Sequence, residues 1–184
     1  MPESPTIAAR LEGAFAKIHA ERMDGVPILN PRLQVEVVGT RDWNGDGLAV
    51  LVTPWFINLM LLPGTEERAQ AWRALALGSS VPHCLPAGRF DFLVSEEDQI
   101  GRYQMCSLFS PVLEFEDQEA ARIAGAAALE ALFDARIDES KDDDGDKRIA
   151  ESDIAPEGAA ESMPRGISRR SLISGKIASG RGPV

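Results

Sequence analysis

Apolar residues recur at helical spacing in three stretches of the chain, and turn residues separate these stretches. The first stretch follows Ser4-Pro5, an N-cap with proline at the first helical position, and Gly25 is suited to end it. The second stretch begins at Thr65, which two glutamates follow directly, and it ends at Gly78. The third is an alanine-rich run that Asp117 caps. The pattern therefore predicts three helices.

Between the helices, apolar and polar residues alternate in a way that is typical of half-buried strands. Residues 33–37 and 90–94 alternate clearly, and residues 103–109 predict a further strand. Residues 44–47, Asn-Gly-Asp-Gly, predict a hairpin turn whose return strand is residues 48–52. Because hairpins outnumber helical crossovers, we expect an α+β fold in which a mostly antiparallel sheet packs with about three helices.

The most apolar segment, residues 53–64, reads TPWFINLMLLPG. As a strand it points Trp55 to one face and Phe56, Asn58 and Met60 to the other. One interpretation is a central strand that is covered on both faces. The other is that one face stays accessible as a docking surface, because tryptophan, phenylalanine and methionine are enriched in interface cores and a buried asparagine without partners is costly. The composition of the segment is compatible with both interpretations.

The chain changes character near residue 137. Residues 1–137 predict one α+β domain, whereas residues 138–184 are rich in Gly, Ser, Ala and Pro and hold no aromatic residue. Within this second part, residues 138–161 are acidic, with ten acids and three bases, and residues 162–184 are basic, with five bases and no acid. Such a composition buries too little apolar area to offset the entropy of ordering, so it predicts a disordered tail.

The acidic balance and the short apolar run narrow the possible partners. A formal net charge of -10 disfavours nucleic acid, because an acidic surface repels phosphates. The apolar run from Trp55 to Leu62 is far shorter than the roughly 20 residues that cross a bilayer, so we expect a protein that is not embedded in a membrane. The N-terminus lacks the features of a secretory signal, and two cysteines give no disulfide framework. These features predict a reduced cytoplasmic protein.

Motifs for catalysis, cofactor binding and metal binding are absent or incomplete. Residues 140–151 resemble a calcium loop, but serine stands at its first ligand position and no amphipathic exit helix follows. His83, Cys84 and Cys106 could form a metal site or a nucleophile with its base, yet no paired cysteine motif supports either. We therefore predict no catalytic, cofactor-binding or metal-binding residues and favour a binding protein. A small hydrolase or transferase of another type is the alternative.

Four segments give the chain a resemblance to the NiFe-hydrogenase assembly chaperone family of the HybE/HupJ type. They are HAERMDGVPILNPRLQVEVVG, VLVTPWFINLMLLPG, LPAGRFDFLV and GRYQMCSLFSPVLEFEDQEAA. The resemblance is collinear from about residue 10 to 135, and its most distinctive blocks are T-P-W-F-x-N-L-x-L-L-P and Y-x-x-C-S-L-F-S-P. Some members of this family carry a fused rubredoxin with paired C-x-x-C motifs, and this sequence holds no such motif.

The resemblance implies a cytoplasmic, non-enzymatic maturation chaperone that needs no cofactor. It implies binding to precursors of the hydrogenase large or small subunit, or to their twin-arginine signal peptides, before export. We expect the partner-facing patch to come from the two distinctive blocks, at Trp55, Phe56, Asn58, Met60, Tyr103 and Phe109. The alternative is a redox or metal-handling maturation factor that uses Cys84 and Cys106. The resemblance leaves open the hydrogenase isoform and the oligomeric state.

The basic tail contains a stretch, Ser168-Arg169-Arg170-Ser171-Leu172-Ile173, that is similar to a twin-arginine signal core. It lies at the wrong end of the chain for an export signal, and no apolar region follows it. One interpretation is a basic solubilising tail. The other is that the tail mimics the signal peptide of a partner and occupies the same binding site.

Overall fold

The computed structural model describes residues 6–134 of the chain. In this part three helices accompany one six-stranded antiparallel sheet, so the predicted α+β fold is confirmed. The strands lie in the order β1-β2-β3-β6-β5-β4. None of the helices in this part is long and apolar enough to span a membrane. The elements are α1 (Ile7–Arg22), β1 (Glu36–Trp43), β2 (Asp46–Val52), β3 (Ile57–Leu62), α2 (Glu66–Trp72), β4 (Ser80–Leu85), β5 (Gly88–Glu97), β6 (Gly101–Phe109) and α3 (Gln118–Leu132).

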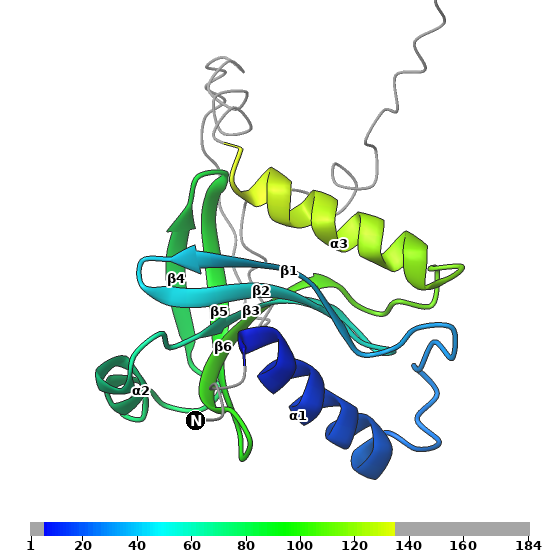
Figure 1. The fold of residues 1–184 in the computed structure, drawn as a ribbon, viewed down its shortest axis with the longest axis horizontal. Helices are drawn as coiled ribbons and strands as arrows, with labels where there is room; N and C mark the ends of the chain where they lie inside the picture. The colour runs from blue at the N-terminus through cyan, green and yellow to red at the C-terminus, as the bar shows by residue number, and fades with distance from the viewer. Residues whose placement is uncertain (1–5, 135–184) are drawn as a thin grey trace, which may run out of the picture.

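The sheet lies between two helices on opposite faces (Figure 1). Helix α3 packs on β1, β2 and β3, and helix α1 packs on β1 and β2 from the other side. Successive side chains of β2 and β3 therefore enter two different cores. Val50 and Leu59 belong to the core on the α3 side, whereas Ala49 and Met60 belong to the core on the α1 side. The short helix α2 adds Trp72 to the α3-side core.

The β1–β2 hairpin turns at Asn44 and Gly45, whose φ angles are 53° and 80°. A two-residue hairpin turn of this type requires positive φ at both central positions, and Asn-Gly is the pair best suited to it. The predicted hairpin is thus confirmed. The strand predicted from residue 33 instead begins at Glu36, because the backbone of Gln34 is hydrogen-bonded to the side chain of Gln118 rather than to a strand.

Helix α1 begins after Thr6, so the predicted cap at Ser4 is wrong. The backbone of Thr6 is extended, with a ψ of 159°, and its hydroxyl accepts a hydrogen bond of 3.2 Å from the amide of Ala9. A threonine with this geometry satisfies one of the free amides at the start of the helix and fixes where the helix begins.

The predicted caps of the other two helices are confirmed. Thr65 accepts from the amide of Arg68 at 3.3 Å, and Asp117 accepts from the amide of Ala120 at 2.8 Å. Helix α2 is shorter than predicted, because hydrogen bonds between residues three apart replace the helical pattern after Trp72. The chain reaches Gly78 through turns.

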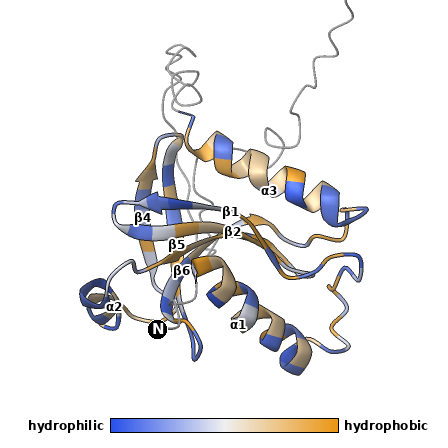
Figure 2. Ribbon diagram, in the orientation of Figure 1, coloured by the Kyte–Doolittle hydropathy of each residue, from blue (hydrophilic) through white to orange (hydrophobic). Residues whose placement is uncertain are grey.

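Strands β5 and β6 are confirmed and are longer than predicted, whereas the sequence pattern does not predict β4. This strand lies at the edge of the sheet and pairs only with β5. It contains Pro82, which donates no hydrogen bond and is tolerated in edge strands. Along β5, buried and exposed residues alternate. Figure 2 shows bands of hydrophobic and hydrophilic colour along the sheet.

Several expectations fall outside the described residues. These are the domain boundary near residue 137, the tail of residues 138–184, the calcium-like segment 140–151 and the twin-arginine-like stretch 168–173.

Candidate partner-binding site

The apolar segment of residues 53–64 forms a turn and then the strand β3. The hydroxyl of Thr53 accepts hydrogen bonds from the amides of Trp55 and Phe56, at 3.3 and 3.0 Å, and donates to the carbonyl oxygen of Phe56 at 2.9 Å. Trp55 and Phe56 therefore lie in a tight turn that precedes the strand. Every residue of β3 is buried, between β2 and β6. For residues 57–62 the structure agrees with a central strand covered on both faces.

The six residues expected to face a partner do not form one continuous patch. Five of them are buried, and only Phe56 is half-buried. Phe109 belongs to the core on the α3 side, whereas the aromatic residues of the turn lie in the core on the α1 side. The buried five are Trp55, Asn58, Met60, Tyr103 and Phe109. Contact between any of the six and a partner stays a prediction.

Aromatic rings hold Phe56 in place on the α1 side of the sheet. Its ring makes edge contacts with Phe15 of α1, at 5.8 Å between centroids, and with Trp55, at 5.5 Å. Phe15 also contacts Tyr103 at 6.2 Å. Burial of the Tyr103 hydroxyl raises the pKa of that group. These contacts give Phe56 a fixed position and leave part of its ring accessible.

Asn58 lies on the same side of the sheet, and only part of its hydrogen-bonding capacity is satisfied. Its Nδ2 lies 3.6 Å from the sulfur of Met105, and its Oδ1 has no hydrogen-bond partner in the described part of the chain. The residue is 4% exposed. A buried acceptor left without a donor costs about 1–3 kcal/mol. The side chain that it contacts, Met105, is flexible and adapts easily to a new neighbour.

The face of the sheet on the α1 side becomes accessible towards β5. Leu93 of β5 lies opposite Met105 of β6, which lies opposite Met60 of β3. Along this row exposure falls from 42% at Leu93 to 0% at Met60, and Met105 is half-buried. We call Phe56, Asn58, Leu93 and Met105 the open-face residues. They combine accessible apolar surface with a buried acceptor that has no donor among residues 6–134.

The two cysteines and His83 do not come together as a reactive group. Paired residues of an antiparallel sheet point to the same face, so Cys84, opposite Arg89, points to the side of Leu93, and Cys106 points to the other. Both thiols are free. Burial, together with the nearby carboxylate of Asp91, raises the pKa of Cys106 to about 11.

His83 is engaged elsewhere in the sheet. Its Nε2 lies 2.7 Å from Oε1 of Gln104, and its ring packs edge-on against Phe92. Among residues 6–134 no three histidine, cysteine or acidic side chains are grouped so that they could hold a metal ion. This geometry does not favour the redox alternative, which depends on a reactive thiol.

Leu93 and Met105 are the residues that the sequence analysis missed. The signal for Leu93 was present, because an apolar residue stands at an outward position between the inward Phe92 and Val94. Met105 has no such signal, since its exposure depends on which strands α1 covers.

Comparison with known proteins identifies the family. The family model described as NiFe-hydrogenase assembly, chaperone, HybE matches residues 6–175. The hydrogenase expression/formation protein HupJ of Bradyrhizobium diazoefficiens is 40% identical over 123 residues, which cover 67% of this chain and 69% of that protein. The probable rubredoxin HupJ of Rhodobacter capsulatus is 36% identical over 121 residues, or 66% of this chain and 42% of that protein.

A solved structure supports the fold. The solution structure of HybE from Escherichia coli matches with a TM-score of 0.54 and 21% identity, over 82% of this chain and 91% of that one. A likeness at this identity concerns the fold alone, whereas the family model spans most of the sequence. The chain therefore belongs to the HybE family of NiFe-hydrogenase assembly chaperones.

Proposed function

We propose that this chaperone binds the precursor of a hydrogenase subunit at its twin-arginine signal peptide, in the cytoplasm and before export. Binding uses noncovalent contacts with the open-face residues, and the protein catalyses no reaction. The observation that carries the proposal is Asn58, whose Oδ1 has no donor within the described residues and whose Nδ2 contacts Met105, the residue opposite the accessible Leu93.

The chemistry of a signal peptide suits this surface. Such a peptide joins a basic region to an apolar region. The apolar region would cover Phe56, Leu93 and Met105, and the remaining exposed area of each is worth about 1 kcal/mol when it is buried. Asp91 points to the same face as Leu93. Its ion pair with Arg89 is long, at 3.9 Å, and exposed, so Asp91 can still attract the basic region. The net charge of -10 favours the approach of a basic peptide from a distance.

Asn58 gives the surface a polar anchor. When the flexible side chain of Met105 moves aside, an N–H group of the bound peptide can donate to Oδ1 of Asn58. The bond satisfies an acceptor that is unpaired in the described part of the free protein, so binding recovers part of its desolvation cost. The small contact area keeps the affinity modest, and release of the matured subunit stays possible.

Fluorescence anisotropy with a synthetic signal peptide tests the proposal. The peptide should contain the twin arginines and the apolar region, and two matched controls should replace the arginines by lysines and leucines of the apolar region by serines. We expect saturable binding of the first peptide and weaker binding of both controls. Equal binding of all three peptides, or none, would contradict the proposal. Recovery of precursor subunits with the purified chaperone is the corresponding experiment in cells.

A further inference from the structure

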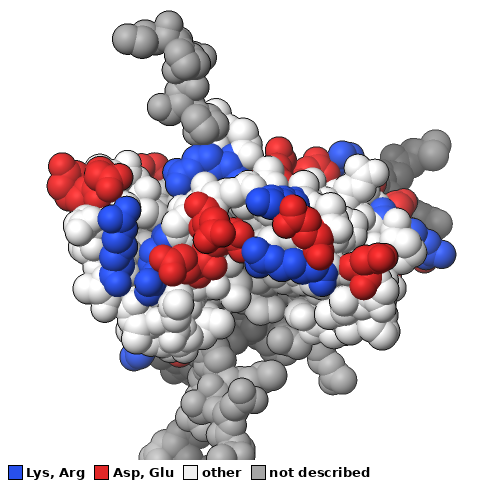
Figure 3. All heavy atoms as spheres, turned by 90° about the horizontal axis from the view of Figure 1, so that it is seen from below, with Lys and Arg blue, Asp and Glu red and all other residues white. Residues whose placement is uncertain are grey.

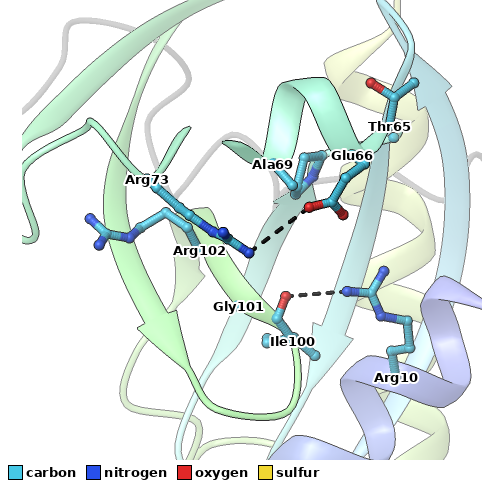
Figure 4. A pocket seen from close by; sticks show the side chains of 10 residues that line it. Arg10, Thr65, Glu66, Ala69, Arg73, Ile100, Gly101 and Arg102 are labelled. Carbon is cyan, nitrogen blue, oxygen red and sulfur yellow. Dashed lines mark hydrogen bonds and ion pairs between the residues drawn. The ribbon is translucent and has the colours of Figure 1, made fainter. Parts of the chain in front are cut away.

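A pocket of about 370 Å³ lies where α1, α2 and the β5–β6 turn meet (Figure 4). Arg10 of α1 forms one wall, residues 63–66 and Arg73 form a second, and residues 100–102 form the third. The pocket is separate from the open-face residues, and none of them lines it.

The pocket gathers positive charge in an acidic protein. Its lining contains three arginines, Arg10, Arg73 and Arg102, and one acid, Glu66. The chain as a whole carries a net charge of -10. On the side of the molecule seen in Figure 3, basic and acidic side chains are interleaved. An excess of arginines in one concave site favours a negatively charged ligand.

The acid in the lining is a weak counter-charge. Oε1 of Glu66 lies 3.9 Å from Nη2 of Arg73, which is too long for a hydrogen bond. The two side chains are 82% and 63% exposed, so water and salt screen their attraction. A ligand that brings a better-placed oxyanion can therefore displace Glu66 from Arg73.

Two of the arginines have donors to spare. Nη2 of Arg10 donates to the carbonyl oxygen of Ile100 at 3.2 Å, and Nη1 of Arg73 donates to Gln70 at 2.9 Å. A guanidinium has five N–H groups, so most of these donors stay available within the described residues. Figure 4 shows the guanidinium of Arg73 pointing towards Glu66 and that of Arg10 pointing towards Ile100, on opposite sides of the same space.

Arg102 has a structural role in the pocket. One of its terminal nitrogens donates to the carbonyl oxygen of Leu75, and the other lies 3.4 Å from a carboxylate oxygen of Glu96. In Figure 4 its side chain points away from the centre of the pocket. Arg102 thus ties the wall of the pocket to the segment after α2 rather than contacting a ligand directly.

We propose that this pocket binds one oxyanion group, a carboxylate or a phosphate, between the guanidinium groups of Arg10 and Arg73. Planar guanidinium groups bind such oxygens with paired, charge-assisted hydrogen bonds. The group can belong to a free anion or to an acidic side chain of a bound polypeptide. The proposal is independent of signal-peptide binding at the open face, because it concerns other residues and a ligand of opposite charge.

The test is an amide NMR titration of the full chain at constant ionic strength, with inorganic phosphate in one series and tetraglutamate in another. We expect saturable shifts at residues 63–66 and 100–102, and about tenfold weaker binding in R10Q and in R73Q. E66Q should bind more tightly than the unchanged protein, because the competing carboxylate is gone. A lower saturating concentration for phosphate assigns the site to a free anion, and a lower one for tetraglutamate assigns it to a polypeptide carboxylate.

R89Q is the matched control, since Arg89 is an exposed arginine of β5 that does not line the pocket. It should bind both probes as the unchanged protein does. The proposal is overturned if neither probe gives saturable shifts by about 20 mM, a concentration that fills a site of millimolar Kd. It is also overturned if R89Q loses as much affinity as R73Q, because the effect would then reflect net charge alone.

Discussion

The two halves of the sheet differ in how they are covered. Strands β1 to β3 lie under α3 on one face. On the other face α1 packs on β1 and β2 and shares a core with Met60 of β3, and every side chain of β3 is buried. Strand β5 buries Phe90, Phe92 and Val94 on one face only and leaves Leu93 exposed on the other. The most apolar segment of the chain is therefore its core, and the accessible apolar surface lies on strands whose sequence is less hydrophobic.

This difference separates stability from recognition. A strand that is covered on both faces contributes mainly to the free energy of folding. A partner can reach such a strand only where a flexible side chain moves aside, as we propose for Met105 next to Asn58. A strand covered on one face can hold a binding residue at a fixed position while its inward residues keep the fold together. Substitutions on the covered and on the open strands therefore test this division.

Leu59→Ala should have the largest effect on stability. Leu59 of β3 is fully buried in the α3-side core, so its truncation leaves a cavity and should lower the free energy of unfolding by about 2–5 kcal/mol. Urea unfolding measures this change. The control is Leu93→Ala on the exposed face, for which we expect a loss below about 0.5 kcal/mol. Equal losses in the two variants would contradict the division between the halves.

Gly125→Ala tests how closely α3 lies against the sheet. A Cβ at this position would come within 2.7 Å of Cγ2 of Val38 and 3.1 Å of Cγ1 of Val50. We expect the free energy of unfolding to fall by about 1–3 kcal/mol. Gly13→Ala in α1 is the matched control, because a Cβ there meets nothing within 4 Å. That change should raise stability by up to about 1 kcal/mol through helix propensity.

Leu93→Ala combined with Met105→Ala should weaken signal-peptide binding. The loss of apolar area on the open face should raise the Kd about tenfold, which corresponds to about 1.4 kcal/mol. Fluorescence anisotropy gives the Kd, and urea unfolding shows that the double variant still folds. An unchanged Kd in a folded double variant would place the binding site elsewhere.

Asn58→Leu should separate the contribution of this residue to stability from its contribution to peptide binding. Leucine has a similar size and removes the unpaired acceptor, so the free energy of unfolding should stay the same or rise by up to about 1 kcal/mol. Peptide binding should weaken, because the polar anchor is lost. A variant that is destabilised by several kcal/mol would show instead that Asn58 is a structural residue of the free protein.

The cysteines should react at very different rates. Because the pKa of Cys106 is raised to about 11, only about a thousandth of this thiol is ionised at pH 8, whereas Cys84 is exposed. Alkylation followed by mass spectrometry should label Cys84 first. The raised pKa also means that the folded state holds the Cys106 proton more tightly. The resulting stability is therefore present below the thiol pKa of the unfolded chain, about 8.5, and is lost as pH rises towards 11. Rapid labelling of Cys106 in the folded protein would support the redox alternative.

Local sequence signals predicted most of the fold. Thr65 and Asp117 cap helices, and Asn44-Gly45 turns a hairpin, because each effect depends on residues close together in the chain. The cap at Thr6 was not predicted, because the nearby Ser4-Pro5 also has the pattern of an N-cap followed by proline. Strand β4 was missed because a short edge strand with proline resembles a loop.

The candidate site was harder to predict, since exposure depends on which elements lie above a strand. Asn58 was recognised as a costly residue, but its sequence neighbours do not indicate that it contacts Met105. The pocket around Arg10, Arg73 and Arg102 unites three segments that are distant in sequence, and no local pattern connects them.

The most direct test of the central claim is a methyl NMR titration of the full chain with a twin-arginine signal peptide. We expect saturable shifts for the methyl groups of Leu93 and Met105, and little change for Leu59 and Leu129 in the core on the α3 side. Shifts confined to Leu59 and Leu129, or no shift at saturating peptide, would show that the signal peptide does not bind at the open-face residues.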